Sequence, residues 1–163
     1  MERKLLIVRH GKSSWETVVE DIDRPLTERG IRNAYDMAER MKKLGHVPET
    51  IYSSPANRAL HTATIMSRTW EIPDSEIIVR DDLYLAGPDE IIEMIFEVPD
   101  EKTTIAIFGH NPGFTQFSNR FLDVILENLP TAGIVVVSLE APSWNDLVGA
   151  KVLNTFVDFP KKG

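Results

Sequence analysis

The sequence has no cysteine, no long apolar run and no excess of basic residues, and each absence removes a class of function. Without cysteine, the chain has no disulfide, no thiolate nucleophile and no cysteine-ligated zinc or iron–sulfur site. No apolar stretch approaches the ~18 residues of a membrane span, so we expect no membrane association. The apolar run near the start is too short for a signal peptide and no small-residue cleavage site follows it, which favours a cytoplasmic protein.

The formal net charge of −7 argues against nucleic-acid binding, because that function relies on a basic surface. It does not exclude an anionic ligand, because a few arginines in one cleft can set the local potential against the global sign. The four histidines show neither His-x-His nor His-x-x-x-His spacing, so we expect no metal site. The 163 residues, 42% of them hydrophobic, predict a single globular domain spanning residues 1–163.

Segments typical of strands and helices alternate along the chain. Strands are predicted for "LLIV", "ETIYSS", "EIIVR", "TTIAIF", "GIVVVSL" and "AKVLNTFV". Helices are predicted after Thr27 up to Gly45, from about Asn57 to Trp70, in "GPDEIIEMIFEV", and from Phe114 to about Leu126. This alternation predicts an α/β three-layer sandwich, in which helices flank a mostly parallel central sheet.

Chemically active side chains follow the predicted strands. The first strand ends in Arg9, His10 and Gly11, the second leads through "SSPANR" to Arg58, and the fourth ends in "GHNPG", which contains His110. Ligands of open α/β sheets bind outside the carboxyl ends of the strands. If these strands are parallel neighbours, two arginines and two histidines therefore meet at one edge of the sheet.

This set of side chains suits a phosphate. The planar guanidinium group of arginine matches two phosphoryl oxygens at once. An imidazole can attack phosphorus and form a covalent intermediate, and a second histidine can hydrogen-bond the oxygens as charge shifts in the transition state. Glycines at positions 11 and 109 are expected to let the backbone turn sharply and approach a ligand closely.

Four motifs occur in order along the chain and together identify a known family: "LLIVRHGKSSW", "RPLTERGIRNA", "IYSSPANRALHTA" and "IAIFGHNPG". The chain resembles the histidine phosphatases of the phosphoglycerate mutase-like superfamily, and among them the compact SixA-type phosphohistidine phosphatases. The resemblance reaches from residue 5 to about residue 115. It implies a mostly parallel sheet with flanking helices and no metal cofactor.

Carried over residue by residue, the resemblance implies that His10 is the nucleophile that accepts the phosphoryl group. Arg9 and Arg58 become the phosphate clamp, and His110 becomes the second histidine of the pocket. Three further positions are candidates for contact with phosphate or substrate, namely Gly11, Ser13 and Asn111. Trp15 is expected to pack against the protein rather than to recognise substrate, and His46 and His61 are expected at the surface.

A proton donor is harder to assign. Many members of the superfamily carry an acidic residue after the third strand, where this chain reads "DDLYLAGPDE", with Asp82 as a weak candidate. An alkyl phosphate expels an alkoxide, whose conjugate acid has a pKa near that of water, ~15.7, so its hydrolysis needs an acid. Phosphohistidine expels an imidazole with a pKa of ~6.5, so the loss of an acid affects its cleavage least.

The sequence therefore predicts a phosphatase whose substrate is a phosphorylated protein, with phosphohistidine on a signalling or phosphotransfer protein as the leading hypothesis. One alternative is a phosphomonoesterase that acts on a small phosphorylated metabolite, such as a sugar, nucleotide or cofactor-precursor phosphate. Another is a phosphate-binding pseudoenzyme with a regulatory role. A mutase is less well supported, because the chain has few additional basic residues to hold a phosphorylated sugar acid in two orientations.

Overall fold

The computed structural model describes residues 1–16 and 18–161. The strands are β1 (Glu2–Arg9), β2 (Thr50–Ser53), β3 (Ile77–Val79), β4 (Thr104–Gly109), β5 (Ile134–Glu140) and β6 (Lys151–Asp158). The α-helices are α1 (Glu28–Lys43), α2 (Asn57–Thr69), α3 (Pro88–Phe96) and α4 (Gly113–Ser118). Short 3-10 turns are η1 (Asp21–Asp23), η2 (Asp74–Glu76), η3 (Asp81–Leu83) and η4 (Trp144–Asp146).

The strands form one mixed sheet in the order β3-β2-β4-β1-β5-β6. Strands β3, β2, β4 and β1 pair in parallel, whereas β5 is antiparallel to both β1 and β6. The prediction of a mostly parallel sheet is confirmed. In the pairing of β1 with β4, Arg9 lies opposite Gly109, so these two strands end at the same level. The residues that follow them, His10 and His110, are thus brought side by side.

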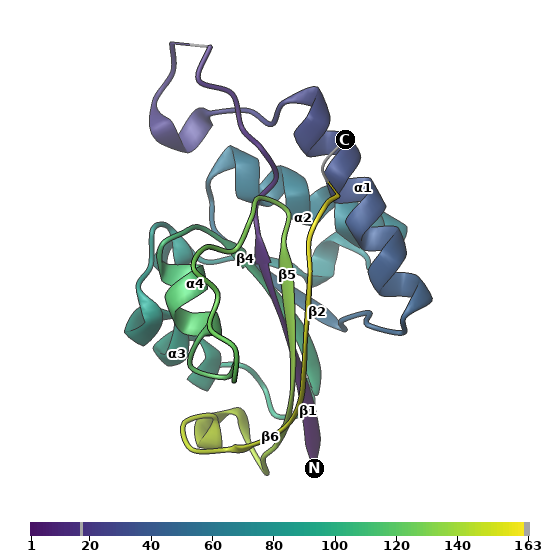
Figure 1. Cartoon of the computed structure of the whole chain (residues 1–163), viewed down its shortest axis with the longest axis vertical. Helices are drawn as coiled ribbons and strands as arrows, with labels where there is room; N and C mark the ends of the chain where they lie inside the picture. Colours follow the sequence, from purple (N-terminus) through teal and green to yellow (C-terminus); the bar gives the residue numbers. More distant parts are fainter. Residues whose placement is uncertain (17, 162–163) are drawn as a thin grey trace.

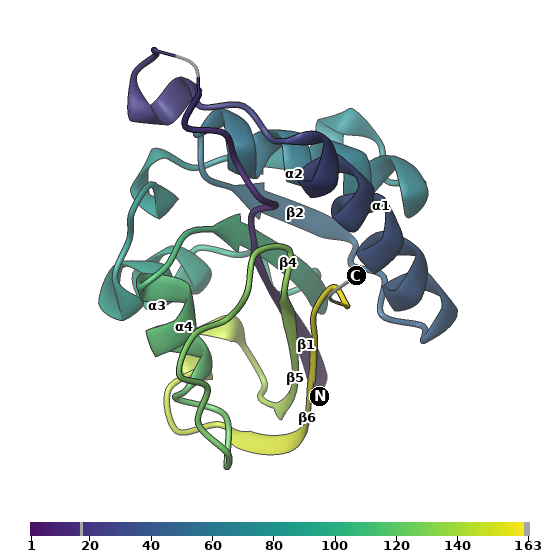
Figure 2. The ribbon, with the colours of Figure 1, turned by 45° about the horizontal axis from the view of Figure 1, so that its top comes forward.

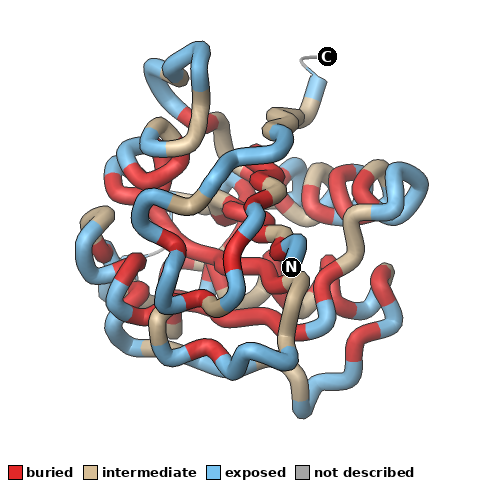
Figure 3. Tube along the Cα trace, turned by 90° about the horizontal axis from the view of Figure 1, so that it is seen from below, coloured by how far each residue is buried: buried red, intermediate tan, exposed pale blue. Residues whose placement is uncertain are grey.

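Helices cover both faces of the sheet, which confirms the three-layer architecture. Helices α1 and α2 lie on one face, and α3 and α4 lie on the other (Figures 1 and 2). Each face has its own apolar core, in which alternate residues of β1 point to opposite sides: Leu6 and Val8 contribute to the core under α1 and α2, and Leu5 and Ile7 to the other. Buried segments therefore run through the centre of the molecule (Figure 3).

Helix α1 shows why the local sequence specifies this arrangement. The hydroxyl of Thr27 accepts a hydrogen bond from the Gly30 amide at 3.0 Å, so Thr27 caps the first turn as predicted. Ala34, Ala38 and Met41 recur at helical spacing and are all fully buried. Gly45, at a φ of 79°, ends the helical segment. Across the described residues, no helix combines the length and apolar character needed to cross a membrane.

Helix α4 is much shorter than predicted. It ends at Ser118, whereas the sequence predicts a helix to about Leu126. The side chain of Asn119 explains the difference, because it accepts a hydrogen bond from the Leu126 amide at 2.9 Å and donates one to the Leu126 carbonyl at 2.8 Å. The chain closes into a loop there, and its apolar residues Val124 and Ile125 are exposed.

Protein packing gives a further reason for the glycines at the ends of β1 and β4. A Cβ atom at Gly11 would lie 2.9 Å from the carbonyl oxygen of Gly30, and one at Gly109 would lie 2.5 Å from the ring of Phe114. Both positions therefore require glycine because another part of the protein packs against them.

Candidate active site

A pocket of about 420 Å³ opens at the carboxyl edge of the sheet, where β1 and β4 end. Its position agrees with the general location of ligand sites in open α/β sheets. It is lined by Arg9, His10, Lys12, Ser13, Trp15, Arg24, Arg58, Leu85, His110, Asn111 and Thr131. The structure thus brings together the two arginines and two histidines that the sequence places after separate strands.

His10 is buried, and one of its two ring nitrogens is already engaged. Its Nδ1 lies 2.7 Å from the carbonyl oxygen of Gly11, which can only accept a hydrogen bond. This contact assigns the proton to Nδ1 and leaves the lone pair on Nε2. His10 therefore presents an unprotonated nitrogen, the form of imidazole that can act as a nucleophile.

His110 lies beside His10, with 5.3 Å between the ring centroids. Its Nε2 is 2.7 Å from the hydroxyl of Ser54, which also accepts a hydrogen bond from the Ala56 amide at 3.2 Å. If the hydroxyl donates to Nε2, the proton of the imidazole is on Nδ1. Among the described residues this buried Nδ1 has no hydrogen-bond partner. An orphaned donor of this kind fits an oxygen atom of a bound anion.

The two arginines reach the pocket from different elements. Arg9, at the end of β1, donates from Nη1 to the carbonyl of Leu129 at 3.0 Å, while its buried Nε has no partner within the described part of the chain. Arg58 extends from the first turn of α2 and is almost fully buried. Burying guanidinium groups is costly unless each finds a partner, so their convergence on one pocket indicates an anionic ligand.

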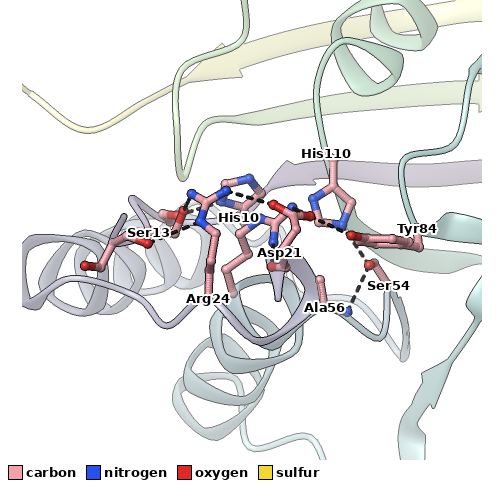
Figure 4. A network of polar contacts seen from close by, with 11 residues as sticks. His10, Ser13, Asp21, Arg24, Ser54, Ala56, Tyr84 and His110 are labelled. Atoms are coloured by element: carbon pink, nitrogen blue, oxygen red, sulfur yellow. Dashed lines mark hydrogen bonds and ion pairs between the residues drawn. The ribbon is translucent and has the colours of Figure 1, made fainter. Parts of the chain in front are cut away.

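Asp21 in η1 is the carboxylate that faces these cations. Its backbone carbonyl accepts a hydrogen bond from Arg58 at 2.7 Å and its side chain accepts another from Arg58 at 3.1 Å. Arg24 donates to the same carboxylate at 3.0 Å, and the Tyr84 hydroxyl donates at 2.5 Å. Figure 4 shows Asp21 between His10, Arg24 and Tyr84. Sequence reasoning missed Asp21 and Tyr84, because nothing in their local sequence indicates that two loops converge here.

The electrostatics of the pocket keep both imidazoles neutral and Asp21 charged. Burial, reinforced by the charges of Arg58 and Arg9, lowers the pKa of His10 to about 4. Burial and the charge of Arg58 lower the pKa of His110 to about 3. The hydrogen bond from Tyr84, followed by those from Arg24 and Arg58, lowers the pKa of Asp21 to about 2. At neutral pH neutral histidines and arginine cations therefore line the pocket, and the ionised Asp21 carboxylate pairs with two of these arginines.

The remaining predicted contact residues have partners within the protein. The amide of Gly11 donates to the Thr62 hydroxyl at 3.0 Å, and Gly11 does not line the pocket. Ser13 lines the pocket, and its hydroxyl accepts a short hydrogen bond from Arg24. Asn111 also lines the pocket, but its amide donates to the Leu129 carbonyl at 2.9 Å and its carbonyl accepts from Thr115.

Asp82 lies outside the pocket lining. Its carboxylate forms two hydrogen bonds with Arg80, at 3.0 and 2.6 Å, and this pairing lowers the pKa of Asp82. His46 and His61 also lie outside the pocket lining. In the described residues, no group of three or more histidine or carboxylate side chains could hold a metal ion.

Trp15 corrects one expectation. It is 78% exposed and lines the pocket, whereas the sequence predicts that it packs against the protein. The guanidinium carbon of Arg24 lies 3.3 Å from the centroid of the indole ring. The tryptophan is thus held at the mouth of the pocket by a cation rather than by an apolar core.

The class of protein follows from comparison with known families. The model of the histidine phosphatase superfamily (branch 1) matches residues 5–84. An uncharacterized protein of Mycobacterium tuberculosis is 30% identical over 150 residues, which cover 86% of this chain and 91% of that protein. The chain belongs to the histidine phosphatase superfamily, and it is a phosphatase.

Solved structures narrow the resemblance to the SixA-type members. A protein of Nakamurella multipartitia, provisionally designated phosphohistidine phosphatase SixA, superposes with a TM-score of 0.78 at 27% identity and covers 98% of this chain and 97% of its own. The protein histidine phosphatase SixA complexed with tungstate superposes with a TM-score of 0.77 at 19% identity, covering 93% and 95%. This chain therefore has the SixA-type form of the phosphoglycerate mutase-like fold.

Proposed function

We propose that this protein hydrolyses phosphohistidine on a signalling or phosphotransfer protein, through a covalent phosphohistidine intermediate on His10. Two observations together carry the proposal. His10 is neutral and has an unprotonated Nε2, and none of the described residues supplies a protonated carboxylate to the pocket. The first feature supplies the nucleophile. The second limits the substrates to those with good leaving groups.

In the first step, Nε2 of His10 attacks phosphorus while the bond from phosphorus to the substrate imidazole breaks. Arg9 and Arg58 hold the phosphoryl oxygens, and the Nδ1–H group of His110 donates to one of them. The other nitrogen of the substrate ring takes a proton from solvent before the bond breaks, so the ring departs as neutral imidazole. In the second step, water attacks the phosphoryl group on His10, inorganic phosphate leaves, and the imidazole of His10 is restored.

The leaving group decides between the candidate substrates. The second ring nitrogen of phosphohistidine can take a proton from solvent, since imidazole has a pKa of ~6.5, and the ring then leaves as neutral imidazole. An alkoxide needs a positioned acid instead, because its conjugate acid has a pKa near ~15.7. Asp82 is paired with Arg80, and Asp21 is ionised because its pKa is about 2. Neither carboxylate carries a proton at neutral pH, and this favours phosphohistidine over a small alkyl phosphate.

The comparisons support the same proposal. Three of the structural neighbours carry the SixA designation, and one of them is a protein histidine phosphatase bound to tungstate, an oxyanion with the shape of phosphate. Arg9 and His110 both line this chain's pocket, and among the described residues the Nε of Arg9 and the Nδ1 of His110 have no partner, which supports binding of such an anion.

The substrate is tested by turnover of a histidine-phosphorylated phosphotransfer domain against a panel of sugar, nucleotide and cofactor-precursor phosphates. We expect kcat/KM for the phosphoprotein to exceed that for every metabolite at least ~10-fold. A metabolite that is hydrolysed faster than the phosphoprotein would establish the small-molecule alternative. Binding of phosphate without turnover of any compound would indicate the pseudoenzyme.

Asp82→Asn tests the absence of a proton donor directly. We expect hydrolysis of the phosphoprotein to stay within about twofold of the unsubstituted enzyme, because an imidazole leaving group needs no acid. Glu97→Gln is the matched control, since Glu97 also pairs with Arg80, at 2.7 Å. A loss of activity in Asp82→Asn that Glu97→Gln does not share would make Asp82 the acid and would contradict the proposal.

The pH profile tests the state of His10. The neutral imidazole attacks, so kcat/KM falls as pH drops through the pKa of His10 in the free enzyme, which burial lowers from 6.5 to about 4. We expect full kcat/KM for nitrophenyl phosphate down to about pH 5, after correction for ionisation of the substrate. A midpoint near pH 6.5 that remains after this correction would show that His10 is not held in its neutral form.

A further inference from the structure

Two large apolar side chains are exposed in the lining of an otherwise polar pocket. Trp15 is 78% exposed and Leu85 is 57% exposed, and both line the pocket that contains His10. The other tryptophans, Trp70 and Trp144, are buried. Large exposed apolar side chains beside a pocket are typical of a surface that contacts a partner.

Trp15 is held in place by its neighbours in the loop that follows β1. Arg24 stacks on the indole ring and donates to the Ser14 carbonyl at 3.2 Å, to the Ser13 hydroxyl and to Asp21. The base of the loop is also closed by a hydrogen bond of 2.8 Å from the Ser14 amide to the carbonyl of Pro25. The indole is therefore presented to solvent by a fixed support, which lowers the entropic cost of binding.

Leu85 reaches the pocket from another part of the chain, after η3. Its φ is 53°, in the left-handed region that leucine rarely adopts. It follows Tyr84, whose hydroxyl donates to Asp21 at 2.5 Å, and it precedes the buried Ala86. An exposed leucine in a strained backbone conformation gains nothing from burial, and such strain concentrates at binding sites.

We propose that Trp15 and Leu85 form an apolar rim that contacts the surface of the phosphoprotein substrate around its phosphohistidine. The inference rests on the proposed function and specifies how the carrier protein is recognised. The pocket contains the cations that bind the phosphoryl group, whereas the rim lies at its mouth. The groups that surround the phosphate in a sugar phosphate are polar and would gain little from contact with an apolar rim. A protein surface supplies apolar side chains next to the modified histidine.

The test compares a phosphoprotein with a small compound that has the same scissile bond. The substrates are a histidine-phosphorylated phosphotransfer domain and phosphoramidate, whose nitrogen–phosphorus bond carries no apolar group that could reach the rim. For Trp15→Ala and Leu85→Ala we expect KM for the phosphoprotein to rise at least ~10-fold, which corresponds to ~1.4 kcal/mol. We expect kcat for the phosphoprotein and kcat/KM for phosphoramidate to stay within about twofold.

Two further variants separate recognition from a general effect on the protein. Trp15→Phe retains an aromatic face and is expected to recover most of the affinity for the phosphoprotein. Val124→Ala and Ile125→Ala remove exposed apolar side chains from residues that do not line the pocket, and they are expected to leave both substrates unaffected.

The outcomes distinguish the rim from the proposed function. Equal losses of kcat/KM on both substrates would mean that Trp15 and Leu85 only support the pocket. An unchanged KM for the phosphoprotein would mean that the two side chains make no contact with it. Either result overturns the proposed rim and leaves the proposed function standing. The same two variants can also be assayed with nucleotide phosphates. A rise in KM for nucleotides rather than for the phosphoprotein would mean that the rim binds a nucleobase, and this would overturn the proposal. Failure of the unsubstituted enzyme to hydrolyse the phosphoprotein would overturn the proposed function.

Discussion

His10→Ala is expected to lower kcat/KM by at least ~10⁴-fold with every substrate, because the variant has no group that can form the covalent intermediate. The loss should appear almost entirely in kcat. Arg9, Arg58 and His110 remain in the pocket, so the affinity for inorganic phosphate should change little. Phosphate titration of the folded variant therefore separates loss of chemistry from loss of structure.

The intermediate itself can be trapped. Rapid denaturation during turnover of a labelled substrate should give an acid-labile, base-stable phosphoryl group that maps to residue 10. His61→Ala is the matched control, because His61 does not line the pocket, and it should keep its full activity and its label. A label on His110, or activity that survives in His10→Ala, would show that the chemistry takes another route.

Arg58→Lys is expected to reduce kcat/KM at least ~10²-fold, although it preserves the positive charge. Arg58 uses one N–H of Nη1 and one of Nη2 on Asp21, at 2.7 and 3.1 Å, and its remaining donors are available to a phosphoryl group. A lysine ammonium has three donors and no planar fork, so it cannot hold both Asp21 and two phosphoryl oxygens in the same geometry.

The loss in Arg58→Lys should be larger in kcat than in KM, because charge spreads over the phosphoryl oxygens in the transition state. Arg68→Lys provides the control, since Arg68 is an exposed residue of the same helix α2 and should tolerate the change. A crystal grown with sulfate should place the anion between Arg9, Arg58 and the two histidines. An anion bound elsewhere, with full activity in Arg58→Lys, would remove Arg58 from the site.

The parts of this site that lie at strand ends could be predicted from the sequence. "LLIVRHG" and "IAIFGHNPG" are apolar runs followed at once by histidine, and parallel pairing of β1 with β4 is enough to bring His10 and His110 together. Arg58 follows from the same reasoning, because it stands in the first turn of the helix after β2. These positions depend on regular structure, whose geometry the local pattern determines.

The parts that depend on loop paths could not be predicted. Asp21 reaches Arg58 only because residues between β1 and α1 fold back over α2, and Tyr84 reaches Asp21 from a segment 63 positions further along the chain. Trp15 was expected to pack against the protein, yet it is exposed, and the guanidinium group of Arg24 stacks on its ring. The end of α4 depended on a pair of hydrogen bonds between Asn119 and Leu126 that no periodicity reveals.

The pairing of β1 has a consequence for the way the protein is made. Residues 2–9 are synthesised before both of their partners, which are residues 104–109 on one side and residues 134–140 on the other. During translation the strand that carries Arg9 and His10 therefore waits, with its apolar residues unpaired, until most of the chain has left the ribosome. Unpaired apolar strands are prone to aggregation, and the pocket around His10 is complete only once β4 has brought His110 beside it.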